Sequence, residues 1–411
     1  MKTLNIGFFL AVGTMACGSI CAETLENLDG VKIGEHLTIR PYVSVQATYD
    51  SNVLPHYKAG EDILWTISPG FKASYVAEKW ALLLDAYYNY RQYCKNENSD
   101  LNRHSFGEKL RWNWSSSLGN EKGWSLLIGE AFQQISMADS MDDRGYSRDG
   151  TCDYRNLEIM AALQRRFSEK WHGNVNASYY WLDYLNDNSR AYYGWDRWAV
   201  GLEGGYAASK WTDILIAGSY QGYTQDNSEG YRYASNGSQG WAVQAGIGSY
   251  MTDRISYRLL AGWSRFDYGN GTDPENGFVY TASGNWKIGE TWNTMLLATS
   301  YYRPSEREYA AKSRVDAISW GLAKTMVRGK LRATLDLRYH RETNESVSRY
   351  GSGYDYIVDI ITARLGLDYR FNRIFSAFGN VEYQKSWDDN ERTDYYDYDR
   401  FRLTLGVRLS Y

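Results

Sequence analysis

The sequence has little of what marks helical membrane proteins, disordered chains and nucleic-acid-binding proteins. Pro occurs only 5 times in 411 residues and the mean hydropathy is -0.56, which argues against a Pro-rich disordered chain and against membrane helices. Beyond the first 22 residues, no run reaches the ~18 consecutive apolar residues of a membrane helix. Lys plus Arg number 45 against 49 Asp plus Glu, so no basic excess points to nucleic acid.

Aromatic residues, in contrast, are abundant. The chain contains 37 Tyr, 16 Trp and 12 Phe, together with 38 Gly. The preferred ring therefore has an apolar body and a polar tip, which suits a boundary between apolar and aqueous surroundings.

The first 22 residues are predicted to be a cleaved signal peptide. Lys2 gives a positive start, residues 6–15 form a short apolar run, and small residues lead to a cleavage site after Ala22. A lipid-modified Cys17 or Cys21 is the alternative interpretation. We expect residues 23–36 to form a short periplasmic N-terminal segment, which tethers the chain or plugs the inner mouth, and 37–411 to form one domain.

Alternation of apolar and polar residues dominates the rest of the chain. Between Leu331 and Tyr339, apolar residues at every odd position interleave with polar and charged ones. Such two-faced segments are typical of β-strands. We expect about eighteen of them, at residues 37–49, 62–76, 79–93, 104–114, 124–137, 154–167, 171–184, 197–208, 213–225, 241–251, 254–268, 278–288, 292–302, 315–326, 330–340, 356–371, 374–387 and 398–411.

The length of these segments and the rhythm of their connections favour a membrane barrel. The segments run to roughly 11–15 residues, against ~5–6 for a typical globular strand. Short connections such as 168–170 alternate with long polar ones such as 138–153. The predicted fold is all-β, a transmembrane antiparallel up-and-down β-barrel of about 18 strands, with 16 as the alternative. A β-propeller is the alternative fold, but it needs four short strands per repeat where this sequence has two long ones.

Aromatic residues gather at both ends of the predicted strands. Trp80 and Trp171 lie beside short turns, whereas Trp181 and Trp263 lie toward long loops. Two aromatic belts that flank an apolar band are typical of outer-membrane barrels. The simpler explanation is the strand propensity of these residues, but propensity would not confine them to strand ends.

The last segment resembles the C-terminal insertion signal of bacterial outer-membrane barrels, which the barrel-assembly machinery reads. The residues of this predicted assembly signal are Phe401, Leu403, Leu405, Val407, Leu409 and Tyr411. The signal implies location in the outer membrane of a diderm bacterium, with both termini periplasmic. Membrane lipid and lipopolysaccharide would then surround the chain.

The opening of the mature chain resembles the first hairpin of the beta-barrel porin 2 type of outer-membrane protein. The resemblance rests on Pro41-Tyr42-Val43, Tyr49-Asp50-Ser51-Asn52-Val53 and Trp65-Thr66-Ile67-Ser68-Pro69-Gly70-Phe71. It implies a porin linked to exopolysaccharide-export gene clusters, and it assigns no catalytic or ligand residues. Pro69 lacks an N–H group inside a predicted strand, so we expect a bulge or kink there.

The interior of the predicted barrel is basic along its last four strands. Three acidic residues, Asp336, Asp368 and Glu382, face the same side. An excess of Arg lowers the barrier for anions and can bind carboxylate or sulfate groups. Ordinary lumen polarity with internal ion pairs is the alternative. The predicted lumen and selectivity residues are Lys330, Arg332, Arg338, Arg364, Arg370, Arg402 and Arg408.

Tyrosines and acidic loops suggest two further kinds of contact. Four tyrosines that the alternation turns inward could stack on sugar rings, or they could simply fill the barrel: Tyr42, Tyr87, Tyr93 and Tyr180. Acidic residues in 138–153 and 388–397 could gather divalent cations or bridge to anionic lipid. No spacing in these loops matches a defined calcium-binding loop.

Enzymatic chemistry has little support in the sequence. The five histidines are His36, His56, His104, His172 and His340, and the spacing places no nucleophile beside them. No clustered ligands indicate a metal site and no cofactor is predicted. Cys94 and Cys152 fall in long loops on one side of the barrel, where a disulfide is as well supported as two unpaired thiols.

The sequence therefore predicts an outer-membrane channel that resembles a porin and is not an enzyme. It would pass small hydrophilic solutes or glycans passively or with weak selectivity, and would lean toward anions. The alternative is a sealed structural or adhesive barrel that presents long extracellular loops. The solute and the oligomeric state do not follow from the sequence.

Overall fold

The computed structural model describes twelve stretches of the chain: 30–53, 60–95, 103–116, 123–136, 153–185, 194–225, 237–249, 254–269, 273–304, 312–345, 355–389 and 397–411. The predicted signal peptide, residues 1–22, lies outside them. All regular secondary structure in these stretches is β-strand. No helix in this part of the chain is long and apolar enough to cross a lipid bilayer.

Eighteen long strands form the fold, and each has between 12 and 15 residues. Their bounds are β2 (Leu37–Asp50), β3 (Asp62–Val76), β4 (Trp80–Tyr93), β5 (Arg103–Ser115), β6 (Trp124–Ser136), β7 (Asp153–Arg166), β8 (Trp171–Tyr184), β9 (Trp195–Ala207), β10 (Asp213–Gln225), β11 (Ser238–Ser249), β12 (Ile255–Asp267), β13 (Glu275–Ile288), β14 (Trp292–Pro304), β15 (Lys312–Met326), β16 (Leu331–Glu345), β17 (Tyr356–Arg370), β18 (Phe375–Asp388) and β19 (Tyr398–Ser410).

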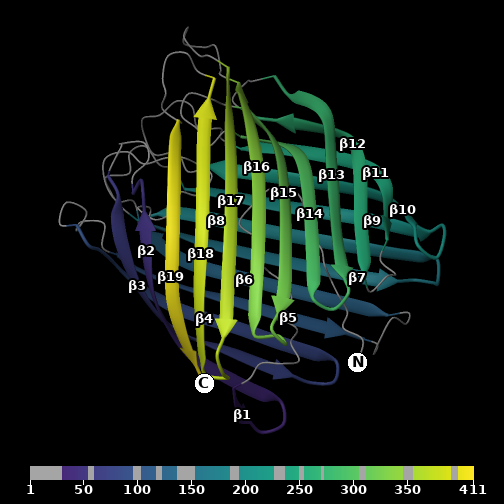
Figure 1. Cartoon of the computed structure of the whole chain (residues 1–411). Helices are drawn as coiled ribbons and strands as arrows, with labels where there is room; N and C mark the ends of the chain where they lie inside the picture. Colours follow the sequence, from purple (N-terminus) through teal and green to yellow (C-terminus); the bar gives the residue numbers. More distant parts are fainter. Residues whose placement is uncertain are drawn as a thin grey trace.

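The strands close into a single antiparallel barrel. Each strand pairs with the next one in the sequence, and β19 pairs with β2 from Arg402↔Asp50 to Ser410↔Tyr42. The short turns and the C-terminus lie at one rim, the lower rim of Figure 1. The predicted fold class and the count of eighteen are thus confirmed, and the alternative of sixteen strands is wrong.

The apolar side of each strand faces outward. On β19, Leu405 is 61% exposed and Leu403, Val407 and Leu409 are exposed with it, while Thr404 between them is half-buried. The same alternation leaves Ile216 63% exposed on β10 while its neighbour Leu215 is fully buried. Because successive side chains of a strand point to opposite faces, the barrel has an apolar exterior and a mostly polar interior.

Aromatic rings and cations meet at the turn-side rim. Trp80 of β4 and Trp114 of β5 are register partners beside a short turn. The Arg165 guanidinium lies 4.5 Å from the ring centre of Trp124. A charged head held over a ring beside an apolar band suits the boundary between lipid and water.

Pro69 does not produce a bulge in β3. β3 keeps one register with β4 on both sides of it, from Ile67↔Tyr90 to Gly70↔Tyr87. The two residues between these pairs have no partner on β4, whereas Pro69 still pairs with Val43 of β2. The expected bulge is therefore wrong, because β3 loses two pairs with β4 without gaining an extra residue. The alternative, a kink at Pro69, stays a prediction.

The described part of the N-terminal segment folds onto the barrel. The short strand β1 (Val31–Ile33) pairs with residues 37–39 of β2 as an antiparallel hairpin. It lies at the same rim as the C-terminus (Figure 1). Residues 23–29, the rest of the predicted periplasmic segment, lie outside the described residues.

Two carboxylates interrupt the apolar exterior between β5 and β6. Glu108 pairs with Ala86 and Phe132, and Glu130 pairs with Leu110 and Ile159. The Phe106 and Phe132 rings, 5.7 Å apart, lie beside the two carboxylates on the same face. An acidic side chain on a lipid-facing surface lowers stability.

Replacing either residue with an apolar one is therefore expected to stabilise the barrel. Glu108→Leu and Glu130→Leu should each raise the free energy of unfolding by about 1 kcal/mol, because carboxylates cost less than the ~2–4 kcal/mol of Arg or Lys at the bilayer midplane. Urea unfolding of the barrel reconstituted in lipid vesicles measures this. Glu158→Leu is the control, since Glu158 pairs with the inward Tyr180 and should not stabilise. A loss of stability in Glu108→Leu would mean that a polar partner covers this face.

Candidate functional site

The candidate site is the inner wall formed by β16 to β19. Of the predicted lumen residues, six lie at inward positions of these strands: Arg332, Arg338, Arg364, Arg370, Arg402 and Arg408. Lys330 does not, because it belongs to the turn 327–330, where its N–H donates to the Val327 carbonyl at 3.1 Å. The predicted strand began one residue too early, and Lys330 is exposed at the turn-side rim.

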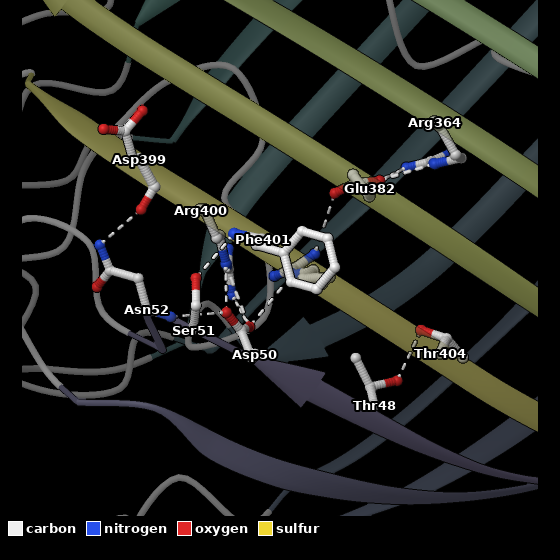
Figure 2. A network of polar contacts seen from close by, with 11 residues as sticks. Thr48, Asp50, Ser51, Asn52, Arg364, Glu382, Asp399, Arg400, Phe401 and Thr404 are labelled. Carbon is white, nitrogen blue, oxygen red and sulfur yellow. Dashed lines mark hydrogen bonds and ion pairs between the residues drawn. The ribbon is translucent and has the colours of Figure 1, made fainter.

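A chain of ion pairs crosses this wall where the barrel closes (Figure 2). Arg364 of β17 donates to Glu382 of β18 through Nε at 2.7 Å, and Nη1 of Arg402 on β19 lies 3.7 Å from the other oxygen of Glu382. Arg402 Nε also donates to Asp50 of β2 at 3.1 Å. Arg400 donates to Asp50 through Nε at 3.0 Å and Nη2 at 2.5 Å.

The closure network, Arg364–Glu382–Arg402–Asp50–Arg400, contains two residues that were not predicted. Asp50 and Arg400 are 4% and 2% exposed, so both charges are almost removed from water. Asp50 lies one residue beyond the predicted end of its strand, which is why it was missed. In the alternation of the last strand, Arg400 faces inward as Arg402 does. This pattern is the signal that could have identified Arg400 as the partner of Asp50.

Positive charge predominates on the inner faces of β16 to β19. Seven arginines face five carboxylates there: Arg332, Arg338, Arg364, Arg370, Arg400, Arg402 and Arg408 against Asp336, Glu342, Asp368, Glu382 and Asp388. Asp50 of β2 also pairs with two of these arginines, so six carboxylates in all oppose the seven arginines. Ion pairing is thus extensive, as the alternative interpretation expected, and it leaves a small basic excess.

Three of the remaining predicted arginines lie nearer the turn-side rim, whereas Arg338 pairs with Thr362 on the loop side of Arg364. Arg332 is the register partner of Asp368. Arg370 Nε donates to the Asn372 carbonyl at 3.2 Å. The Arg408 guanidinium lies 5.4 Å from the ring centre of Phe378, and Arg408 is exposed. These cations therefore line the inner mouth on the turn side.

Two of the four predicted tyrosines lie flat against the wall. The Tyr42 hydroxyl donates to Asp85 at 3.1 Å, and its ring covers Gly70, where an added Cβ would meet Tyr42 Cζ at 2.6 Å. The Tyr87 hydroxyl lies 2.6 Å from where a Cβ on Gly107 would be. Because glycine leaves room for each ring, these side chains narrow the lumen less than upright rings would.

The other two tyrosines belong to a buried apolar layer at the loop-side end of the interior. Tyr93 packs with Val53 and Leu64, and Tyr180 stacks on Trp195 with ring centres 4.7 Å apart. Similar clusters continue around the wall. We call these residues the loop-side collar: Val53, Leu64, Tyr93, Tyr154, Tyr180, Leu182, Tyr223, Phe266, Tyr268, Val279, Tyr301, Val315, Ala317, Tyr356, Val358 and Ile360.

The described histidines each have a hydrogen-bond partner. His36 contacts the Val76 carbonyl at 2.8 Å, His172 contacts Asp213 at 3.1 Å, and His340 contacts Glu342 at 3.0 Å. His104 bonds the Tyr88 hydroxyl, and His56 lies outside the described residues. Across the described stretches, no group of three or more His, Cys, Asp or Glu side chains could hold a metal ion.

The predicted disulfide involves a residue outside the described stretches. Cys94 is exposed just beyond the end of β4. Cys152 lies outside the described residues, so the pairing stays a prediction.

Comparison with known proteins finds similar architectures and no family. No protein-family model matches the chain, so the resemblance to the beta-barrel porin 2 type rests on residues 41–71 alone. No curated protein matches it. Among solved structures, the siderophore receptor PirA from Pseudomonas aeruginosa is 8% identical, with 91% of this chain and 80% of that chain covered and a TM-score of 0.38.

Two further solved structures show the same level of similarity. The FrpB iron transporter from Neisseria meningitidis (F5-1 variant) is 9% identical, with 94% of this chain and 83% of that chain covered and a TM-score of 0.45. OccAB3 from Acinetobacter baumannii is 10% identical, with 91% and 99% covered and a TM-score of 0.40. At these identities and TM-scores, the similarity carries no argument about what this chain binds or transports.

Proposed function

We propose that this chain is an outer-membrane channel that passes small hydrophilic solutes and leans toward anions. The observation that carries the proposal is the closed eighteen-stranded wall with an apolar exterior and a charged interior. An apolar outer band suits acyl chains, and barrels of this size leave room for water inside. The basic excess on β16 to β19 would lower the energy of an anion more than that of a cation.

The proposal includes the orientation and assembly of the barrel. Short turns and the C-terminus share one rim (Figure 1), which in outer-membrane barrels is the periplasmic one. The outward, exposed side chains of β19 and the exposed Tyr411 after it support the role of this segment as the signal for the barrel-assembly machinery: Phe401, Leu403, Leu405, Val407, Leu409 and Tyr411.

Two observations bear on how selective the channel would be. The loop-side collar supports a constriction toward the loops, because its side chains are at most 9% exposed. Tyr42 and Tyr87, flat on the wall, favour glycans as a second class of solute, since the C–H faces of sugars pack on such rings. A collar that seals completely would instead favour a structural or adhesive barrel.

Ion selectivity in a planar bilayer tests this function. We expect single channels that prefer chloride over potassium. Glu382→Gln should raise the chloride-to-potassium permeability ratio by up to about five-fold, since one unit charge at a few ångströms is worth ~1 kcal/mol in water. Asp399→Asn is the matched control, because Asp399 bonds Tyr383 on the outer face of the same strand pair and should not change the ratio.

Each alternative function predicts a different result in the planar-bilayer recordings. A clear cation preference in the wild type would remove the basic-wall hypothesis. Absence of channels from correctly folded protein would favour the sealed barrel. Reversible block by a neutral oligosaccharide would support passage of glycans.

A further inference from the structure

At their loop-side ends, the neighbouring strands β13 and β14 of the barrel wall are not paired with each other. Their register runs from Ile288↔Trp292 to Thr281↔Thr299 and, within the described residues, goes no further. Both strands nevertheless continue. Residues 275–280 of β13 still pair with β12, and residues 300–304 of β14 still pair with β15.

The two edges overlap instead of pairing. Tyr302 of β14 is an even number of residues from Leu296, so its position faces outward as that of Leu296 does. Tyr302 is nevertheless buried against Phe266 and Val279, which lie on the inner face of β12 and β13. A Cβ on Gly277 would lie 2.0 Å from the Tyr302 hydroxyl. The loop-side end of the β12–β13 hairpin therefore laps over the outer face of β14.

A hydrogen bond from the interior holds the inner edge of this overlap. The Tyr302 carbonyl accepts from Gln221 Nε2 of β10 at 3.3 Å. The two residues are 81 positions apart, and β11, β12 and β13 lie between their strands in the sheet. β14 therefore reaches inward past the edge of β13.

Next to the overlap lies a crevice of about 370 Å³ that crosses the seam. Its charged lining residues are Glu275, Lys312, Arg314, Asp316, Arg341 and Glu345. The β15 residues among them share the parity of Ile318 and Trp320, which are exposed on the outer face. The crevice therefore opens outward, directly on the loop side of the apolar band.

The charges of the crevice are balanced but remain accessible. Arg314 lies 3.2 Å from Asp316, and their side chains are 36% and 28% exposed. Lys312 lies 3.7 Å from Glu345, which is 42% exposed. Arg341 donates Nε and one Nη to Asp359, at 2.7 and 2.9 Å, and is itself 46% exposed, so its other Nη can meet an oxyanion.

We propose that this crevice binds the phosphorylated headgroup of a membrane lipid together with a divalent cation. An arginine guanidinium can donate two parallel hydrogen bonds to two oxygens of a phosphate. Oxygen ligands from phosphate and carboxylate groups suit Mg²⁺ or Ca²⁺. Three cations and three carboxylates give the lining no net charge, so a phosphate needs an accompanying cation to be neutralised. The acyl chains would lie on the apolar face below, beside Ile318 and Leu337. This site rests on the proposed location in a membrane.

Lipid retention by the purified barrel tests the site. Native mass spectrometry of detergent-extracted protein is carried out with three probes: diphosphoryl lipid A, the same acylated disaccharide without phosphates, and inorganic phosphate. We expect retention of diphosphoryl lipid A with Mg²⁺ and its release by a chelator. The double variant Arg314→Gln with Arg341→Gln should weaken retention about tenfold or more.

A matched variant separates this site from the charged rim in general. Arg155 is also an outer-face arginine near the loops, 43% exposed and paired with Asp183 at 2.9 Å, but it is not among the residues that line this crevice. Arg155→Gln should retain the lipid as the wild type does. Equal loss in both variants, equal retention in both, or equal binding of inorganic phosphate would overturn the proposal. Retention that a chelator does not change would overturn the role of the cation.

The test also distinguishes failure of the site from failure of the proposed channel. Because the crevice faces outward, the double variant should conduct as the wild type does and should keep the heat-modifiable gel migration of a folded barrel. A wild type that conducts but retains no lipid contradicts the site alone. A wild type that shows neither conductance nor heat-modifiable migration contradicts the channel. A double variant that does not fold is replaced by Arg314→Lys, which should keep the charge but weaken binding.

Discussion

Asp50→Ala is expected to lower the free energy of unfolding by about 3–5 kcal/mol, the cost of leaving a buried charge without its partner. Asp50 accepts hydrogen bonds from Arg400 (Figure 2) and from Arg402, and Arg400 is 2% exposed. Without the carboxylate, two guanidinium groups would face each other at the place where β19 meets β2. The effect should be large because this pairing closes the barrel.

An exposed ion pair between β18 and β19 is the control. Lys385 and Asp399 lie 4.0 Å apart with side chains 50% and 62% exposed, so Asp399→Ala should cost at most ~1 kcal/mol. Urea unfolding in lipid vesicles, followed by tryptophan fluorescence, compares the two variants. The double variant Asp50→Leu with Arg400→Met should recover part of the loss, because it removes both charges. Equal effects of Asp50→Ala and Asp399→Ala would contradict a structural role for the closure network.

Leu405→Arg should destabilise the barrel by about 2–4 kcal/mol, the cost of a cation at the lipid-facing midplane. Leu405 lies in the middle of β19, and its side chain is 61% exposed on the outer face. In water, this substitution on an exposed side chain would be nearly neutral. The size of the effect therefore reports what surrounds the barrel.

A neighbouring inward residue gives the comparison. Gln46 of β2 pairs with Gly406, next to Leu405, and lies on the inner face. Gln46→Arg keeps a polar side chain in a polar interior and should change the free energy of unfolding by less than ~1 kcal/mol. Vesicle unfolding of both variants decides between a lipid-facing and a water-facing exterior. A neutral Leu405→Arg would exclude the membrane location.

The strand pattern could be predicted because it is local. Over residues 331–340 of β16 and 401–410 of β19 the alternation is unbroken, so the outward residues follow from parity alone. The aromatic ends of strands could be located for the same reason. Pro69 shows the limit of such reasoning, since its missing N–H group predicted a bulge, but the paired neighbours on both sides hold the register.

The site could be predicted only in part. The inward arginines follow from parity, but their partners depend on which strands are adjacent and in which register. Arg364 meets Glu382 because their positions face each other across β17 and β18. Lys330 was misplaced by one residue, which moved it from the wall to a turn, since strand ends are set by turn geometry more than by alternation.

The sequence by itself determined which face of each strand is apolar, how many strands there are and where the connections are short. These properties depend on residues a few positions apart, and a period of two suffices to express them. The tertiary structure alone decided that Asp50 meets Arg400 from 350 positions away, and that β12 and β13 overlap β14 instead of closing edge to edge. Such contacts depend on the register and curvature accumulated around the whole ring, which no local pattern encodes.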